Sequence, residues 1–580
     1  MSAKKTVLFA QLPIPRLSIL HEDHNIPVAA LHLQAYLLDQ EIAAHFSFQL
    51  LDPFLQNYGS DEAIISEMRA IAPDVICFSL FCWNVERSLF VAEQIKQRAA
   101  GRPAPIILAG GPEVTPDNAL LRHPAIDGYA YGEGELTLRL LLEALFKTGR
   151  VPHDVPGTLI MRNGVWQAQP PQTQAIDLNT VRSPYLMGLV PPGRWQEMHV
   201  ETMRGCPFSC RYCYYNKQCG DVRFLRQEAV LDLVRYGLNH GYSGMFLLDP
   251  SFNIRPDLAE LLTKIAALNP ERRLKLATEL RADMIDKRLA RLLAEAGMYE
   301  VELGLQSIHA DTMRQIGRTQ SLEKFRRGAQ AMSAQGIETK VDLIVGLPGD
   351  DLDKFKASAR WVKKHGLDGF LQVFCLSVLP GTHFRAHARE LGLNFSPLPP
   401  YYLQSSAAWS VEAIQEAFSW TEDYFDMTFE PDMEETCSFA PALSGRLQEI
   451  IEARPAQPLA YPARAANITK WRVGAIAREE DLFAHLPVMQ AFTRNNPHGV
   501  YLVYLELAQP IPIEAIFEFY AAVTPLQQRF LDRDLGVLTR DDEPIFHYQL
   551  SLLIREADRR RFPERYLNAL QDALRIEWIP

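Results

Sequence analysis

Two long stretches of the sequence alternate short apolar strands with amphipathic helices, and this pattern constrains the fold more than any other feature. In residues 1–150 the apolar runs are separated by segments with helical spacing of apolar residues, such as residues 28–40 and 88–100. Alternation of this kind predicts an α/β domain with a doubly wound, mostly parallel sheet. The expected strands are "TVLFAQL" (6–12), "FSFQLLDP" (46–53), "DVICFSLF" (74–81), "PIILAGG" (105–111) and "IDGYAYGEGE" (126–135).

Residues 196–387 repeat the alternation with six strand-like runs. Six β/α units in a row predict a barrel or an open part-barrel, in which the chemistry gathers at the carboxyl ends of the strands. The expected strands are residues 197–203, 244–250, 274–280, 299–307, 339–349 and 368–382.

Two further regions complete the expected domain organisation, because 580 residues exceed what one hydrophobic core can hold. Residues 151–195 read as a hairpin and linker, since Asn163-Gly164 suits a tight turn between alternating strands. Residues 388–580 are less regular and predict a mixed α+β domain that caps the barrel and shapes substrate choice. A helix over residues 410–425 and a strand over residues 500–507 are its clearest elements.

Charge and hydropathy exclude several classes of protein. The net charge of −11 and a pI near 5.8 argue against a nucleic-acid or membrane-surface role. No apolar run is long enough for a membrane span, and the N-terminus does not resemble a signal peptide. We therefore expect a cytoplasmic protein without a nucleic-acid partner.

The string "RGCPFSCRYC" places Cys206, Cys210 and Cys213 directly after the first expected barrel strand. Zinc sites usually use four ligands, whereas three thiolates can hold three irons of a [4Fe–4S] cluster and leave the fourth iron open. Buried structural thiols are the alternative, and Cys219 is a less favoured fourth ligand. The remaining cysteines, Cys77, Cys82, Cys375 and Cys437, read as small buried residues.

The cysteine spacing, with an aromatic residue before the last cysteine, resembles the radical S-adenosylmethionine (SAM) superfamily over residues 196–387. The resemblance implies a partial (β/α)6 TIM barrel. It also implies that the open iron chelates the amino and carboxylate groups of SAM, whose cleavage yields a 5′-deoxyadenosyl radical.

The same resemblance implies a set of SAM-binding residues. Tyr212 would line the adenine pocket, Gln306 and Ser307 of "GLQS" would contact the ribose, and Gly346 of "VGLPGD" would lie in the second adenine segment. The segment "FLLDPSFN" (246–253) would help to hold the methionine end. Arg281, Glu302 and Glu279 are further candidates at strand ends, and ion pairing inside the barrel is the alternative for them.

Residues 5–145 resemble the Rossmann- or flavodoxin-like cobalamin-binding domain that precedes the barrel in one branch of this superfamily. The resemblance rests on "NIPVAALHLQAYL" (25–37), Ser79, Gly110 and Gly111 in "AGGPEVT", and Gly132 and Glu133 in "YGEGE". It implies that the serine and the glycine pair make room for the dimethylbenzimidazole tail. His24, in "EDHNIP", departs from the pattern of a cobalt-ligating histidine, so we expect an ordinary loop residue there.

Together the two resemblances imply a cobalamin-dependent radical SAM methyltransferase. Such an enzyme moves a methyl group from SAM via methylcobalamin to an unreactive carbon or phosphorus centre of a small-molecule or peptide substrate. A flavodoxin or ferredoxin would be the reductant. The alternatives are a non-methylating enzyme of the same branch that performs cyclisation, rearrangement or oxidation, a non-radical methylase like the tryptophan C2-methylating enzyme, and a non-catalytic sensor.

Overall fold

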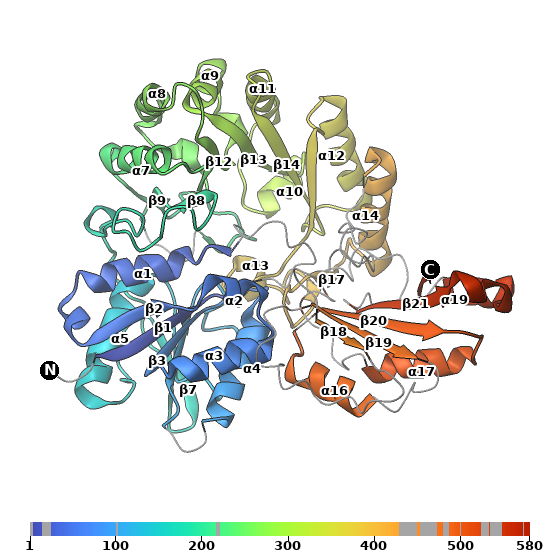
Figure 1. Cartoon of the computed structure of the whole chain (residues 1–580). Helices are drawn as coiled ribbons and strands as arrows, with labels where there is room; N and C mark the ends of the chain where they lie inside the picture. The colour runs from blue at the N-terminus through green and yellow to red at the C-terminus, as the bar shows by residue number, and fades with distance from the viewer. Residues whose placement is uncertain are drawn as a thin grey trace.

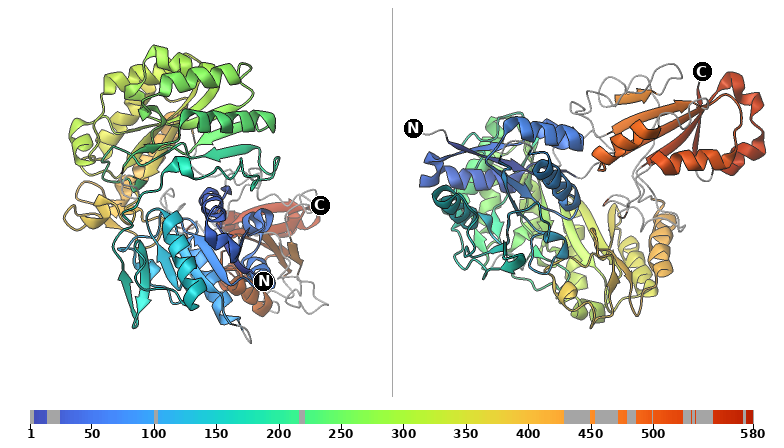
Figure 2. Two further views of the ribbon diagram at one scale, coloured as in Figure 1. Left: turned by 90° about the vertical axis from the view of Figure 1, so that its left-hand side faces the viewer. Right: turned by 90° about the horizontal axis from the view of Figure 1, so that it is seen from below.

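The structure is a computed structural model with three parts along the chain, an N-terminal sheet domain, a part-barrel and a C-terminal sheet (Figure 1). Figure 2 shows the same parts from two further sides, with the orange-to-red C-terminal sheet separate from the green barrel helices. The structure describes residues 4–13, 25–99, 103–215, 221–427, 449–452, 472–478, 486–498, 500–523, 530, 533, 548–571 and 574–579.

The N-terminal domain contains the expected doubly wound sheet. Its first five strands lie in the order β2-β1-β3-β4-β5 and pair in parallel. Alternate residues of β1 face opposite layers: Val7 and Phe9 share a core with α1 and α5, and Leu8 shares a core with α3 and α4. The elements are β1 (Lys5–Ala10), α1 (Val28–Leu38), β2 (Phe46–Leu50), α3 (Asp61–Ile71), β3 (Val75–Ser79), α4 (Val85–Gln97), β4 (Ile106–Gly110), β5 (Gly128–Ala130) and α5 (Gly134–Thr148).

The hairpin of β6 (Thr158–Arg162) and β7 (Val165–Ala168) has the predicted turn, with Asn163 and Gly164 both at positive φ. It is not a free connector, because β6 pairs antiparallel with β5 and extends the first sheet to seven strands. The physical reason is burial: Leu159 and Ile160 join the cores of the N-terminal domain.

The second part is an open part-barrel of six parallel strands in sequential order. Val301, Leu303 and Leu305 of β13 face the helices, so Glu302 and Gln306 lie on the opposite, lumen-facing side. The strands are β8 (Glu197–Val200), β11 (Gly244–Leu247), β12 (Lys275–Leu280), β13 (Met298–Gln306), β14 (Glu338–Val345) and β15 (Phe370–Cys375). The helices are α7 (Gln227–Asn239), α8 (Leu258–Leu268), α9 (Lys287–Ala296), α11 (Leu322–Ser333) and α12 (Leu352–Lys364), which lie outside the strands in Figure 1.

The C-terminal part is more regular than its sequence indicated. After α14 (Val411–Phe425), which packs against α12, five strands pair in parallel and in sequential order. They are β18 (Glu449–Glu452), β19 (Arg472–Arg478), β20 (Val500–Leu507), β21 (Tyr548–Arg555) and β22 (Arg575–Ile579), with helices α16 (Leu486–Asn495), α17 (Ile513–Val523) and α19 (Glu564–Gln571). This part contacts the N-terminal domain, where the His498 backbone N–H donates to the Asp61 carboxylate at 2.9 Å.

Loops at the carboxyl ends of the two principal sheets contact each other. The loop after β4 contacts the segment that follows β15, and the start of α5 contacts the loop after β8. The carboxyl ends of both sheets therefore meet at one interface. No helix in the part of the chain that the structure describes is long and apolar enough to cross a membrane.

Candidate functional site

The loop that contains Cys206, Cys210 and Cys213, here called the cysteine loop, follows the carboxyl end of β8. Its base is closed by a short antiparallel pair, β9 (Met203–Arg204) with β10 (Arg223–Phe224). Cys210 is buried, and Cys206 and Cys213 are half-buried. The structure therefore places the three thiols at the carboxyl end of the barrel, as the sequence predicted, whereas Cys219 and His24 lie outside the described residues.

Asp249, which follows β11, fixes the start of the loop. Its carboxylate accepts hydrogen bonds from the backbone N–H groups of Thr202 at 2.8 Å and Met203 at 3.0 Å. Burial raises the pKa of Asp249 to about 7 although these hydrogen bonds oppose the shift. The segment "FLLDPSFN", which we expect to hold part of SAM, thus also fixes the start of the cysteine loop.

Backbone contacts hold the middle of the loop against the segment after β13. The Arg211 N–H donates to the carbonyl oxygen of Ile316 at 2.9 Å. Gly317, at φ +67°, lies so close that a Cβ atom there would be 2.8 Å from the carbonyl oxygen of Ser209. A side chain at position 317 would therefore displace the cysteine loop.

Arg318 is the residue at this site that the sequence did not reveal. Its Nη1 atom lies 3.8 Å from Cys210 Sγ and 3.3 Å from the hydroxyl oxygen of Tyr212, and Nη2 donates to the carbonyl oxygen of Gly304. One half-buried arginine thus links the cysteine loop to β13. A single arginine after a short helix belongs to no sequence motif with a fixed spacing. Only the tertiary structure therefore shows this link.

Two guanidinium groups influence the ionisation of the Cys206 thiol. Burial raises the pKa of Cys206, and the positive charges of Arg281 and Arg318 act in the opposite direction. Arg281 lies 4.3 Å from the ring centroid of Phe208 in the cysteine loop and pairs with Asp283 at 3.1 Å. Positive charge beside three cysteines favours thiolates, the form that binds iron.

The donor set fits a cluster better than a single ion. Among the described residues no three histidine, cysteine or carboxylate side chains converge on one metal position. Each thiolate of a [4Fe–4S] cluster binds a different iron, so three cluster ligands need no common point. Cys206, Cys210 and Cys213 are therefore the residues that would hold the cluster.

Buried polar atoms without hydrogen-bond partners lie on or directly after three of the barrel strands. They are Ser251 Oγ after β11, Gln306 Oε1 at the end of β13 and Asp342 Oδ1 on β14. Gln306 is 92 % buried and adopts φ +68°, a strained conformation for a residue other than glycine. Buried polar groups are normally paired, so these atoms fit a ligand with amino and hydroxyl groups, as SAM has.

The other expected SAM contacts have partners within the protein. Ser307 is fully buried and its hydroxyl accepts from the His309 N–H at 3.3 Å. Gly346, at φ +95°, packs so that a Cβ atom would lie 2.8 Å from the side chain of Leu403. These two residues shape the strand ends, and their contact with SAM stays a prediction.

Three carboxyl groups lie inside the lumen. Burial and the charge of Glu302 raise the pKa of Glu279 to about 7. Burial, Glu302 and Glu279 raise the pKa of Asp342 to about 9, and burial raises that of Glu302 itself. Without a bound cation, these three neighbouring carboxyl groups therefore favour their protonated forms.

The expected cobalamin-binding residues lie at the carboxyl edge of the first sheet. Ser79 and Gly110 are register partners at the ends of β3 and β4, and β3 adjoins β1 where the strand order reverses. A Cβ atom at Gly111, φ +111°, would lie 2.5 Å from the carbonyl oxygen of Leu80. Ligands of such sheets bind at this switch point, so the small residues present fit the cofactor.

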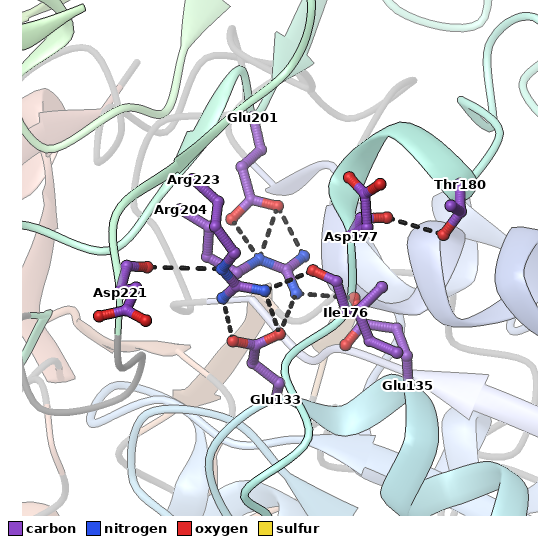
Figure 3. Close-up of polar contacts among 9 residues, drawn as sticks. All are labelled: Glu133, Glu135, Ile176, Asp177, Thr180, Glu201, Arg204, Asp221 and Arg223. Carbon is purple, nitrogen blue, oxygen red and sulfur yellow. Dashed lines mark hydrogen bonds and ion pairs between the residues drawn. The ribbon is translucent and has the colours of Figure 1, made fainter.

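Gly132 and Glu133 lie at the interface between domains. Gly132 adopts φ +77°, and Glu133 is the residue before α5. The Glu133 carboxylate pairs with both Arg204 and Arg223 of the cysteine-loop base (Figure 3). Arg204 also pairs with Glu135 at 2.9 Å and with Glu201 at 2.7 Å. The carboxylate of Glu133 thus binds the barrel, and its contact with cobalamin stays a prediction.

A second interface joins the loop after β4, which follows Gly110 and Gly111, to the segment after β15. The Tyr401 hydroxyl donates to the Glu113 carboxylate at 2.6 Å, and Asn118 donates to the same oxygen at 2.9 Å. The Gly381 N–H donates to Asp117 at 3.0 Å. Burial raises the pKa of Glu113 to about 7, above its ordinary value of 4.5.

We expect Glu133→Gln to destabilise the chain by about 2 kcal/mol, because it leaves two largely buried guanidinium groups without their shared carboxylate. Glu143→Gln, which removes an α5 carboxylate from an i,i+4 pair with Arg139, is the matched control and should cost less than about 0.5 kcal/mol. Urea unfolding of both variants measures the difference. Equal costs would contradict a structural role for the Glu133 network.

We expect Glu113→Gln to gain stability relative to the wild type as the pH rises from about 5 to about 8. Because the pKa of Glu113 is raised in the folded state, its protonated carboxyl group contributes to the free energy of unfolding. This contribution is fully present below the ordinary pKa of 4.5 and is lost as the pH rises through about 7. The relative gain should reach up to about 3 kcal/mol. Urea unfolding at both pH values tests this, and parallel pH dependences of the two proteins would contradict it.

Comparison with known proteins supports the two-domain interpretation. A family model described as the B12 binding domain matches residues 25–142, and a model of the radical SAM superfamily matches residues 200–362. The second match spans the cysteine loop and most of the barrel.

Two curated relatives are similar to about two thirds of the chain. The chain is 28 % identical over 407 residues to the cobalamin-dependent radical SAM methyltransferase TokK of Streptomyces tokunonensis, covering 66 % of this chain and 58 % of that protein. It is 27 % identical over 398 residues to the 2-(S-pantetheinyl)-carbapenam-3-carboxylate methyltransferase of Streptantibioticus cattleyicolor, covering 64 % of this chain and 56 % of that protein. The chain thus matches little more than half the length of either relative.

The fold agrees with a solved structure of a similar protein. The radical SAM methyltransferase TsrM of Kitasatospora setae superimposes with a TM-score of 0.56 at 18 % identity, over 68 % of this chain and 80 % of that one. At this identity the likeness concerns the fold. The two matches, in this order along the chain and with the cysteine loop inside the second, identify a B12-binding domain followed by a radical SAM domain.

Proposed function

We propose that this chain is a cobalamin-dependent radical SAM methyltransferase, which transfers a methyl group from SAM to an unreactive carbon or phosphorus centre of a small-molecule or peptide substrate. The names of its two matched relatives support methyl transfer. The site supports it as well, because the residues at both loops fit their cofactors.

The observation that carries the proposal is the contact between the two cofactor loops. Glu133, in the "YGEGE" loop of the B12-binding domain, pairs with Arg204, which lies two residues before Cys206. Methyl transfer needs both reactive centres within one closed cavity, and an ion network holds the two loops together here. A protein that used its domains separately would need no such contact.

The residues divide into binding roles. When bound, the cluster and cobalamin supply one-electron reduction of SAM and a carrier for its methyl group. Cys206, Cys210 and Cys213 hold the cluster, and Arg318 fixes the loop against the barrel. Gln306 and Asp342 accept hydrogen bonds from SAM. The remaining proposed contacts with SAM are Ser251, Tyr212, Ser307, Gly346 and Arg281. The proposed contacts with cobalamin are Ser79, Gly110, Gly111 and Gly132.

We further propose a cytoplasmic location and a flavodoxin or ferredoxin as electron donor, since an exposed iron–sulfur cluster of low potential needs a reducing partner.

Replacing any of Cys206, Cys210 or Cys213 by alanine should abolish cluster assembly and SAM cleavage, because each thiolate holds one iron. Cys375→Ala, which removes a buried thiol on β15 of the same barrel, is the matched control and should keep the cluster. Iron and sulfide content and the visible spectrum after anaerobic reconstitution measure the outcome. A normal cluster in any of the three loop variants would contradict the assignment.

Incubation of the reconstituted protein with cobalamin, SAM and a reductant should yield both 5′-deoxyadenosine and S-adenosylhomocysteine, because radical methylation consumes SAM in two ways. Chromatography of the nucleosides measures this. Deoxyadenosine alone would favour a non-methylating reaction, and S-adenosylhomocysteine alone would favour non-radical methyl transfer. Neither nucleoside from a protein with bound cluster and cobalamin, even when candidate substrates are added, would favour the sensor.

A further inference from the structure

The cysteine loop reaches the protein surface between its first two cysteines. Of the described residues 205–215, Pro207 and Ser209 are exposed, and the others are buried or half-buried. Because Cys206 and Cys210 would each hold an iron, a bound cluster would lie directly behind these two residues. We call Pro207 and Ser209 the exposed edge of the loop.

The end of helix α10 (Ala310–Gln315) lies beside the exposed edge. Gly317, two residues after this helix, is so close to the loop that a Cβ atom there would lie 2.8 Å from the Ser209 carbonyl oxygen. The Gly317 N–H also donates to the carbonyl oxygen of Arg314 at 3.2 Å, as in the usual glycine ending of a helix. The last turn of α10, which carries Arg314, is therefore fixed next to the exposed edge.

Two arginine side chains flank the exposed edge without a carboxylate partner. Arg211 donates from Nη1 to the Gln315 carbonyl oxygen at 3.1 Å, so its guanidinium lies at the carboxyl end of α10. Arg314 is exposed, and neither arginine forms an ion pair with a described residue. Asp311, the acid of this helix, lies in its first turn and pairs with Lys354 at 2.6 Å. The surface beside the exposed edge thus carries two uncompensated positive charges in a chain whose net charge is −11.

The hydrogen bond to α10 holds the Arg211 side chain in place and leaves most of its donors free. A guanidinium has five N–H donors, and one of them is engaged with the Gln315 carbonyl oxygen. A side chain that is already held in one geometry loses less conformational entropy when it meets a carboxylate. Arg211 is therefore preorganised to bind a carboxylate that comes from outside the chain.

We propose that an acidic electron-transfer protein docks on the exposed edge, and that Arg211 and Arg314 bind its carboxylates. The reduced donor gives one electron to the cluster and is itself oxidised by one electron. Positive charge beside a redox centre steers an acidic donor towards it, and electron-transfer interfaces are small and transient, so two arginines are a substantial part of one. The inference rests on the proposed function and adds to it the docking site of the electron donor.

The dependence of electron delivery on ionic strength tests the docking. The probe is an acidic flavodoxin in its hydroquinone form, at concentrations where the formation of 5′-deoxyadenosine by the cluster- and cobalamin-loaded full chain is proportional to flavodoxin. We expect the rate to fall about tenfold between about 0.01 M and about 0.15 M salt, because the screening length shortens from about 30 Å to about 8 Å. A rate that ignores salt would overturn the proposal. So would a chain that reduced methyl viologen activates and flavodoxin does not.

Variants locate the docking site. Arg314→Glu should slow the flavodoxin-driven rate about tenfold, because it replaces an attraction by a repulsion. Arg211→Gln should slow it about threefold, since it removes one charge and adds none. Arg273→Glu, at an exposed residue just before β12 and so at the opposite end of the barrel, is the matched control and should leave the rate unchanged. Equal rates in all three variants, at equal iron content, would overturn the proposal.

Reduced methyl viologen and calorimetry distinguish this inference from the proposed function. Viologen is a small cation that delivers one electron without a docking site, so Arg314→Glu should cleave SAM with it at the wild-type rate. Slow cleavage with viologen as well would place the fault in the cluster site and overturn the docking role. Calorimetric titration with oxidised flavodoxin should show binding that Arg314→Glu weakens about tenfold. Such binding by a wild-type chain that cleaves no SAM with viologen would overturn only the proposed function.

Discussion

Arg204 is the centre of the ion network on which the arrangement of the two cofactor domains depends. Its guanidinium meets Glu201 of the barrel and Glu133 and Glu135 of the B12-binding domain, with its side chain only 12 % exposed. In such surroundings each charge needs its partners, because an unpaired one would carry the full cost of desolvation. The network therefore favours one orientation of the two domains, in which the "YGEGE" loop adjoins the cysteine loop.

The cysteine loop itself has little regular structure, so its shape depends on contacts with the barrel around it. Asp249 holds its start, Gly317 admits its middle and Arg318 reaches Cys210. Asp249 follows β11, whereas Gly317 and Arg318 both follow β13. A loop held from several sides keeps its thiols in place before the cluster binds, which reduces the entropy that cluster binding must overcome.

The lumen below the loop has a different character. Its carboxyl groups have raised pKa values because desolvation penalises their charged forms, and the charges of neighbouring acids add to the effect. A cationic ligand would reverse this balance by stabilising the charged forms.

Much of this organisation could be predicted from the sequence, because alternation of apolar runs and the spacing of three cysteines are local properties of the chain. Strands β1 to β5, the six barrel strands and the hairpin turn at Asn163-Gly164 lie close to the predicted positions. The parallel C-terminal sheet could not be anticipated, since its strands are separated by long connections with weak periodicity. The roles of Glu133, Asp249 and Arg318 depend on contacts between segments far apart in the chain. Such contacts arise only from packing, so the tertiary structure alone decided which polar residues support the loop and which face the lumen.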